Sequence, residues 1–309
     1  MHTSFTKLFL FAALAVVASL SAGEYPRRPQ AQQPLFPFAV LTDVQYADKE
    51  PAGARAYRRS LRKLEESAAA INAEGPAFIV HLGDLIDEAG AGNLDRILAA
   101  FDRLQARKYH VLGNHDFSVS RAEWLRRLGL AHAWYDFAHR GWRFVVLDGM
   151  DVSVGGWPRE SPRYRVGEAL LNRLRQAGRP NAVDWNGGVG EEQESWLRQV
   201  LQAAARRHER AIILCHFPVL EASSTAQHLL WNHEEIVRIL EEHSAVVAWF
   251  NGHDHRGGYA RRNGVHYVTF PGMVESGNVN SWTMVRVFQD RLELRGAGAA
   301  PSRVLDIRR

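Results

Sequence analysis

Side chains that can bind metal ions occur in five short clusters along the sequence. Asp43 and Gln45 form the first cluster, and Asp84 follows Gly83 in the second. Each cluster comes directly after a run of apolar residues, which is the pattern of a buried strand. The donors are carboxylate and amide oxygens and imidazole nitrogens, with no thiolate among them. The seven candidate ligands are Asp43, Gln45, Asp84, Asn114, His216, His253 and His255.

Seven donors of this kind exceed the four that a closed zinc site uses. They fit two divalent ions that share one bridging carboxylate, with a water molecule between the ions. Such a pair, ~3.5–4 Å apart, lowers the pKa of the water and holds both oxygens of an in-line displacement at phosphorus. The mixed oxygen and nitrogen donors favour manganese, with magnesium or iron(II) as alternatives. The neutral amide oxygen of Gln45 is a harder ligand than the nitrogen of an imidazole, which disfavours zinc at this ion site.

Glycine precedes three of the candidate ligands, Asp84, Asn114 and His253. Because glycine adopts unusual dihedrals without strain, we expect it to let the chain turn sharply as each ligand leaves its strand. A single Gly-Asp or Gly-Asn pair is usually only a turn, and a lone histidine is usually structural. Five clusters in this order, all at strand ends, are hard to explain in that way.

The first part of the chain is predicted to alternate between strands and helices. Apolar runs indicate strands over 35–42, 77–82 and 109–112, and apolar residues at helical spacing predict helices over about 53–74 and 94–104. Each strand ends where a donor cluster begins. This pattern predicts a parallel α/β sheet whose site lies at the carboxyl ends of its strands.

The later part of the chain adds further strands. An antiparallel pair is predicted over 134–138 and 142–147, and strands over 211–215 and 245–250 lead into the last two clusters. Helices are expected near 196–204 and 236–240. The tail is expected to form a second sheet, with strands near 258–262, 264–270, 281–288 and 291–296. No linker divides these elements, which predicts one two-sheet domain with helices outside.

Residues 149–190 are rich in Gly, Pro, Asn and Arg, with one helix expected near 166–177. Connections this long are usually functional or disordered. Their aromatic and polar residues, including Trp185 and Asn186, suggest a cap on the substrate side, and Asn186 is a candidate substrate contact. A surface excursion without a role is the alternative.

The N-terminus is predicted to be a signal peptide over residues 1–22. Lys7 precedes an apolar run from about 8 to 20, which ends in small residues. The run is shorter than the ~20 residues of a spanning helix, which favours cleavage over an uncleaved anchor. Residues 23–35 are predicted to be a flexible lead-in to a domain over 36–309. The mature protein would then be exported, periplasmic or secreted, without stable membrane insertion.

Composition excludes several other classes of protein. A net charge of +4 over 309 residues, without a basic stripe interleaved with aromatics, argues against nucleic-acid binding. A single cysteine excludes an intrachain disulfide. Cys215 lies in an apolar run and is interpreted as a buried strand residue rather than a nucleophile. The sequence does not specify the oligomeric state.

In the order of its clusters, the sequence resembles the calcineurin-like metallophosphoesterases. That family has an Asp-x-His start, Gly-Asp, Gly-Asn-His-Asp/Glu, a His after a strand, and Gly-His-x-His. The present chain carries Gln45 where most members have histidine. This departure, together with the segments 43–48, 82–87, 185–188 and 252–259, resembles the manganese-dependent ADP-ribose/CDP-alcohol diphosphatases over about residues 36–308.

The resemblance implies an α/β fold, a four-layer αββα sandwich of two mixed β-sheets flanked by helices. It implies that Asp84 bridges two ions, and that His115 stays free of metal on the leaving-group side as a general acid. Asp116 would orient His115, whereas Asp87 is either a further contact of the site or a helix N-cap. Arg256 is a candidate phosphate contact. One ion would be held by Asp43, Gln45, Asp84 and His255, and the other by Asp84, Asn114, His216 and His253.

The expected function is hydrolysis of the phosphoanhydride in nucleoside-diphosphate-linked compounds such as ADP-ribose and CDP-alcohols. The attacking group would be a hydroxide that bridges two metal ions, and the partner would be a small nucleotide-type molecule. One alternative is an exported phosphomonoesterase or phosphodiesterase of broad specificity. A non-catalytic metal-binding scaffold is a further alternative, which the complete set of ligands disfavours.

Overall fold

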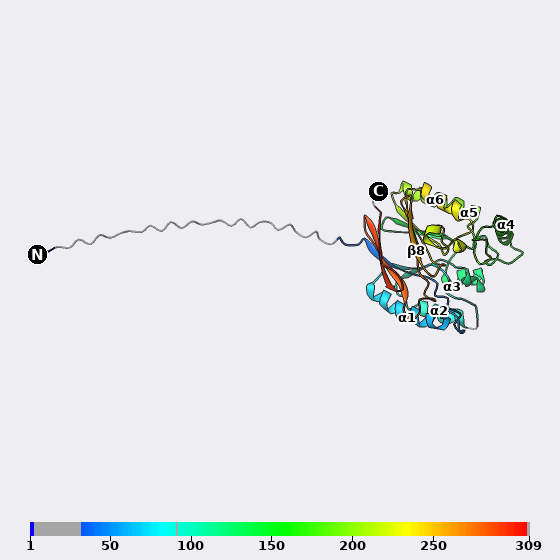
Figure 1. Ribbon diagram of the computed structural model, residues 1–309, viewed down its shortest axis with the longest axis horizontal. Helices are drawn as coiled ribbons and strands as arrows, with labels where there is room; N and C mark the ends of the chain where they lie inside the picture. Colours follow the sequence, from blue (N-terminus) through cyan, green and yellow to red (C-terminus); the bar gives the residue numbers. More distant parts are fainter. Residues whose placement is uncertain (3–31, 91, 308–309) are drawn as a thin grey trace. The chain divides into compact units, whose positions relative to one another are not determined.

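The computed structural model describes residues 1–2, 32–90 and 92–307. Most of the predicted signal peptide and most of the predicted lead-in lie outside the described residues, so both remain predictions. Among the residues that are described, no helix is both long and apolar enough to cross a membrane. From Pro34 onward the described chain forms one compact unit, which Figure 1 shows in ribbon form.

The first sheet contains six strands in the order β12-β11-β10-β1-β2-β3. Strands β1, β2 and β3 run parallel to one another, whereas β10, β11 and β12 join through antiparallel pairings. The sheet is therefore mixed, as expected. Its strands are β1 (Phe36–Leu41), β2 (Phe78–His81), β3 (Arg107–His110), β10 (Ser281–Val287), β11 (Arg291–Gly298) and β12 (Arg303–Asp306).

The second sheet also contains six strands, in the order β4-β5-β6-β7-β9-β8. Its four central strands are parallel, and β4 and β8 pair antiparallel at the two edges. The antiparallel pair predicted around Arg140 and Gly141 is confirmed as β4 and β5. The strands are β4 (Tyr135–His139), β5 (Trp142–Val146), β6 (Arg210–Leu214), β7 (Val246–Asn251), β8 (Gly258–Arg262) and β9 (Val265–Thr269).

Three hydrophobic clusters give the unit its four layers. One lies between the sheets, where Phe38 of β1 packs edge-on against Phe144 of β5 with ring centroids 5.4 Å apart. A second covers the outer face of the first sheet with α1, α2 and α3, and a third covers the second sheet with α5 and α6 (Figure 1). The helices are α1 (Tyr57–Glu74), α2 (Asn93–Phe101), α3 (Arg121–Leu128), α4 (Pro162–Gln176), α5 (Glu191–Arg206) and α6 (His233–Glu242).

Helix α1 illustrates how the sequence specifies these layers. Its buried residues recur at helical spacing and include Leu64, Ala68 and Ile71, all at most 1% exposed. The helix ends at Gly75, which takes the left-handed conformation with φ 62° and donates its N–H to Asn72 O. Replacing Leu64 with Ala would leave a cavity in this layer and cost about 2–5 kcal/mol.

The tail differs from the expectation of a separate second sheet. Strands β8 and β9 extend the sheet of β6 and β7, whereas β10 and β11 extend the sheet of β1. Strand β12 has no counterpart among the predicted strands, and β3 lies two residues earlier than expected. Strand pairing is a long-range property that local alternation of apolar residues cannot specify, so the strands were predictable but their partners were not.

Candidate metal centre

The predicted ligands come together where the carboxyl ends of strands from the two sheets meet. In the first sheet, β1 ends just before Asp43 and β2 just before Asp84. In the second sheet, β6 ends just before His216, and β7 ends just before His253. These strands are parallel neighbours within each sheet, so their ends lie side by side. Each sheet therefore supplies one wall of the site.

Four of the ligands gather around the ring of His216. Its Nε2 lies 3.2 Å from Asp84 Oδ2, 3.2 Å from Asn114 Oδ1 and 3.1 Å from His253 Nδ1. Asp84, His216 and His253 are buried, and one donor atom from each lies within 4.8 Å of the others, a spacing that suits a metal ion. This group matches one of the two predicted ligand sets.

The other predicted set gathers around His255. Its Nε2 lies 3.2 Å from Asp43 Oδ1 and 3.1 Å from Gln45 Nε2, and Gln45 Nε2 lies 3.1 Å from Asp84 Oδ2. Asp84 therefore touches both groups. Gln45 Oε1 is buried without a hydrogen-bond partner among the described residues, an arrangement that costs free energy unless a cation or water satisfies the oxygen. The carboxylate and imidazole donors fit a divalent ion here, and the unpartnered Oε1 is the Gln45 atom that could bind it.

Four of these ligands sit on a strained backbone. Asp43, Gln45, Asp84 and His253 have positive φ angles of 50°, 44°, 57° and 71°. Non-glycine residues in this region cost about 1–3 kcal/mol each and persist where the surrounding structure fixes them, often at functional sites. This backbone conformation directs each side chain away from its strand and toward the other ligands.

The preceding glycines serve two different purposes. Gly83 has a φ of 100°, as expected for a sharp turn. Gly113 and Gly252 are needed instead because the chain packs too closely for any side chain. A Cβ on Gly113 would lie 2.1 Å from Asp84 Oδ1, and one on Gly252 would lie 2.0 Å from Thr42 Oγ1. These two glycines therefore permit close approach rather than an unusual dihedral.

Each ligand histidine has a partner on its second nitrogen. His216 Nδ1 lies 2.8 Å from Leu82 O, which can only accept, so this nitrogen carries the proton and Nε2 faces the other donors. His253 Nε2 lies 3.0 Å from Asn186 Oδ1. His255 Nδ1 forms an ion pair of 2.9 Å with Glu275. Such partners fix the orientation of metal-binding histidines.

Asn186 was expected to contact substrate, and its position corrects that expectation. The side chain is fully buried, and its Nδ2 lies within 3.1 Å of the carbonyl oxygens of Asn181, Gln227 and Leu229. These acceptors fix the amide so that Oδ1 faces His253. His253 Nε2 must then carry the proton, which leaves Nδ1 free to bind metal. Asn186 is a positioning residue rather than a substrate contact.

Replacing Asn186 with Ala should lower manganese affinity about 10- to 100-fold, the usual effect of losing a partner of a metal-binding histidine. Calorimetric titration of metal-free protein measures this change. Asn232→Ala is the matched control, because Asn232 binds the backbone of Val189 in the same loop as Asn186 and has no hydrogen bond to His253 within the described chain. Equal losses in the two variants would mean that Asn186 acts only by holding the loop.

Two of the ligand histidines favour the positively charged imidazolium form at neutral pH in the metal-free protein. Burial lowers the pKa of His216, but Asp84 and Asp43 outweigh it and raise the pKa to about 9. The pKa of His255 is likewise raised to about 10, because Asp43 and Glu275 outweigh burial. By contrast, burial and the charge of His216 hold the pKa of His253 well below its ordinary value.

Metal binding near pH 7 should therefore release protons, roughly two for a fully loaded site. Both pKa values are raised, so protons compete with metal below about pH 9, and affinity should rise as the pH approaches 9 to 10. Calorimetry in two buffers with different ionisation enthalpies measures the release. A binding enthalpy that is independent of the buffer would contradict these protonation states.

His115 lies beside the ligands, at the start of a 3₁₀ turn over His115–Ser118. Its backbone N–H donates to Asp84 Oδ1 over 2.8 Å. Its Nδ1 forms an ion pair of 2.9 Å with Asp87, which also contacts Lys49. Burial lowers the pKa of His115, but Asp84 and Asp87 outweigh it, so the pKa is raised and the protonated form favoured. His115 is thus suited to donate a proton.

Asp116 does not take the predicted role of orienting His115. One of its oxygens accepts from the backbone N–H groups of Asp84 and Gly113, and the other accepts from those of Leu85 and Ile86. The carboxylate thereby ties the loop after β2 to the loop after β3. Asp87 contacts His115 instead, which favours the first of the two roles expected for it, a further contact of the site.

The ligands open into a cavity of about 270 Å³. Arg256 is absent from its described lining, and its side chain is 68% exposed and bonded to Asp254. The structure therefore does not place Arg256 in the cavity expected to hold the phosphate, because its guanidinium pairs with Asp254. Residues from both sheets and from the 149–190 segment line the cavity: Gln45, Arg55, Asp84, Asn114, His115, Trp185, His228, His253 and His255.

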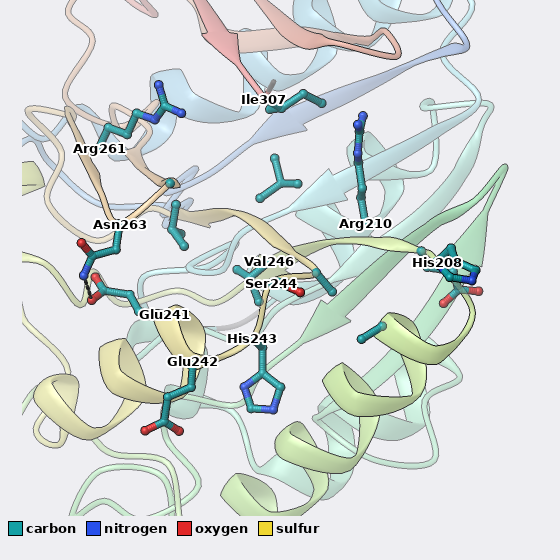
Figure 2. Close-up of a pocket in the computed structure, with 16 residues that line it drawn as sticks. His208, Arg210, Glu241, Glu242, His243, Ser244, Val246, Arg261, Asn263 and Ile307 are labelled. Carbon is teal, nitrogen blue, oxygen red and sulfur yellow. Dashed lines mark hydrogen bonds between the residues drawn. The ribbon is translucent and has the colours of Figure 1, made fainter. Parts of the chain in front are cut away.

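A larger cavity, of about 600 Å³, lies away from these residues (Figure 2). It is lined by Arg210 and Val246, the first residues of β6 and β7, and by Glu241 and His243 at the end of α6. The metal ligands follow the opposite ends of the same strands. None of the predicted site residues is among its described lining, so volume alone does not identify the site.

Comparison with known proteins decides the family. The family model described as calcineurin-like phosphoesterase matches residues 36–257. The chain belongs to this family. Fully buried Cys215, whose thiol pKa burial raises to about 12, agrees with catalysis by a metal centre rather than by a thiolate.

Relatives of this metallophosphoesterase match along most of their length. The manganese-dependent ADP-ribose/CDP-alcohol diphosphatase of Arabidopsis thaliana is 33% identical over 298 residues, covering 86% of this chain and 95% of that protein. The Bos taurus protein of the same name is 30% identical over 325 residues, covering 91% and 96%. These matches, the family and the cluster of ligands make the protein a metal-dependent phosphohydrolase.

Solved structures agree with the αββα fold. A dimetal phosphatase from Danio rerio superimposes with a TM-score of 0.84 at 29% identity, covering 89% of this chain and all of that one. A purple acid phosphatase from yellow lupin gives a TM-score of 0.57 at 13% identity, covering 89% of this chain and 53% of that one, which shows the fold alone.

Proposed function

We propose that the protein hydrolyses the phosphoanhydride of nucleoside-diphosphate-linked compounds, such as ADP-ribose and CDP-alcohols, with two manganese ions. The observation that carries the proposal is the contact of Asp84 with both groups of ligands, beside a histidine held by Asp87. The names of the relatives that match over nearly their whole length support the choice of substrate.

The residues present suggest how the reaction proceeds. When bound, two divalent ions would lower the pKa of a water molecule and neutralise the phosphoryl oxygens. A water molecule that has lost one proton to solvent would form the new bond from its oxygen to one phosphorus, as the bridging P–O bond breaks. His115 donates its proton to the leaving phosphate, and Asp87 stabilises the imidazolium beforehand. Asp43, Gln45, Asp84 and His255 would hold one ion, and Asp84, Asn114, His216 and His253 the other.

A panel of substrates tests the proposal. Purified protein is assayed on ADP-ribose, CDP-choline and p-nitrophenyl phosphate with Mn²⁺, Mg²⁺ and Zn²⁺ in parallel. We expect the highest kcat/KM on the two diphosphates with Mn²⁺, giving nucleoside monophosphate as one product. Turnover of the monoester without hydrolysis of either diphosphate would favour the exported phosphatase of broad specificity. A protein that turns over none of these substrates with any of the three ions would favour the non-catalytic scaffold.

We also propose export, on the basis of the leader alone. The predicted cleavage near residue 22 lies outside the described part of the chain. N-terminal sequencing of the protein from its native cells tests this proposal, and an intact leader on the mature protein would argue for an anchor instead.

A further inference from the structure

The cavity beside the metal ligands contains one arginine among its described lining residues and no lysine. That residue, Arg55, lies just before α1 and outside every motif of the sequence. Five of the predicted ligands and His115 line the same cavity. A substrate bound at the ligands therefore lies in the same cavity as Arg55, a cation to which the proposed reaction assigns no role.

The position of Arg55 is fixed from two sides. Its Nε donates to Glu275 Oε1 over 3.1 Å, and Glu275 in turn pairs with His255. The next residue, Ala56, donates its N–H to Val274 O over 3.1 Å, which ties the backbone beside Glu275. The side chain is nevertheless 35% exposed. Arg55 is therefore both anchored and accessible from the cavity.

Arg55 also lies near enough to His115 for its charge to act on the imidazole. Two residues further on, Tyr57 carries the ammonium of Lys49 over its ring, 4.3 Å from the centroid. Lys49 contacts Asp87, and Asp87 holds His115. The segment that bears Arg55 is thus packed against the group that positions the proton donor.

We propose that Arg55 binds the leaving phosphate of a diphosphate substrate and so selects diphosphates over simple monoesters. This inference rests on the proposed function. In a phosphoanhydride the leaving group is itself a phosphate, whose charge grows as the bridging bond breaks. A guanidinium matches a phosphate with two parallel N–H donors, and here Nε is bonded to Glu275 while the Arg55 side chain lines the cavity. A monoester such as p-nitrophenyl phosphate offers no second phosphate for this contact.

The test compares Arg55→Gln and Arg55→Lys with the wild type. In the Gln variant, kcat/KM for CDP-choline should fall by about 10²-fold, the scale of losing one fixed donor to developing charge. The kcat/KM for p-nitrophenyl phosphate should change by no more than about threefold, since that reaction lacks the contact. The Lys variant should be intermediate because it keeps the charge and loses the fork. Arg58→Gln, three residues further on in α1 and paired with Asp48 and Glu50 outside the cavity, is the matched control.

A binding measurement separates this role from an indirect one through Glu275. Calorimetry with α,β-methylene-ADP should show affinity about tenfold weaker in Arg55→Gln, whereas affinity for inorganic phosphate and for Mn²⁺ should stay close to wild type. Glu275→Gln should instead weaken Mn²⁺ binding, because Glu275 orients His255. Equal losses on both substrates together with weaker Mn²⁺ binding in Arg55→Gln would overturn the proposal.

The two proposals can fail independently. If the wild type does not hydrolyse CDP-choline, the proposed function fails, and the methylene-ADP measurement still decides the role of Arg55. If the wild type hydrolyses CDP-choline but Arg55→Gln binds and cleaves diphosphates as well as Arg58→Gln does, only the inference about Arg55 is overturned. A normal melting temperature in each variant establishes that the protein is folded.

Discussion

Asp84→Asn is expected to lower kcat/KM by at least about 10³-fold, because losing the carboxylate that both groups of ligands share forfeits several kcal/mol of charge stabilisation. Asp84 Oδ2 lies 3.2 Å from His216 and 3.1 Å from Gln45, so no other side chain can replace it at both places. Manganese content should fall in parallel. The measurements are steady-state kinetics and elemental analysis of the same preparation.

Asp95→Asn serves as the control for Asp84→Asn. Asp95 is 73% exposed and pairs with Arg127 on the surface, so its replacement changes the net charge equally and leaves the site intact. Wild-type rates in both aspartate variants would contradict the role of Asp84 as the carboxylate shared by two metal ions. Melting temperatures of the metal-free proteins test whether the Asp84 variant retains its fold.

Asp87→Asn should reduce kcat by about 10²-fold with manganese content unchanged, because it removes the carboxylate that stabilises protonated His115. The pH profile carries a distinct signature. Asp87 helps to raise the pKa of His115, so its loss lowers that pKa and the proton is lost at lower pH. The alkaline limb of the kcat profile should therefore shift toward lower pH.

Asp116→Asn provides the contrast, because Asp116 binds four backbone N–H groups rather than His115. We expect that variant to lose about 1–3 kcal/mol of stability, because a buried acceptor of backbone N–H groups is replaced. A shifted alkaline limb in Asp116→Asn, with no shift in Asp87→Asn, would restore the role that the sequence suggests for Asp116.

The ligands were predictable because their signal is local. Each of Asp43, Asp84, His216 and His253 follows an apolar run, and parallel strands bring their ends to one edge. The gathering of these side chains at one place and the two-sheet architecture could therefore be inferred before any coordinates. Which sheet each tail strand joins could not, because strands β9 and β10 are neighbours in sequence but belong to different sheets.

The groups that support the ligands carry no such signal. Glu275 lies in an irregular segment between β9 and β10, outside any motif. Only the fold brings it into contact with His255. Asp116 follows His115 directly within its motif and Asp87 lies three residues after Asp84, yet the fold shows that Asp87 is the one that reaches His115. Arg256 follows a ligand directly yet points away, whereas Arg55, far from every motif, lines the cavity. Sequence proximity is a poor guide to such contacts.

Anomalous diffraction from crystals grown with Mn²⁺ tests the central claim most directly. We expect two manganese peaks, about 3.5–4 Å apart, with the Asp84 carboxylate bound to both. His216 and His253 should contact one ion, and His255 should contact the other. A single peak, or two peaks of which Asp84 reaches only one, would contradict the shared centre on which the proposed hydrolysis depends.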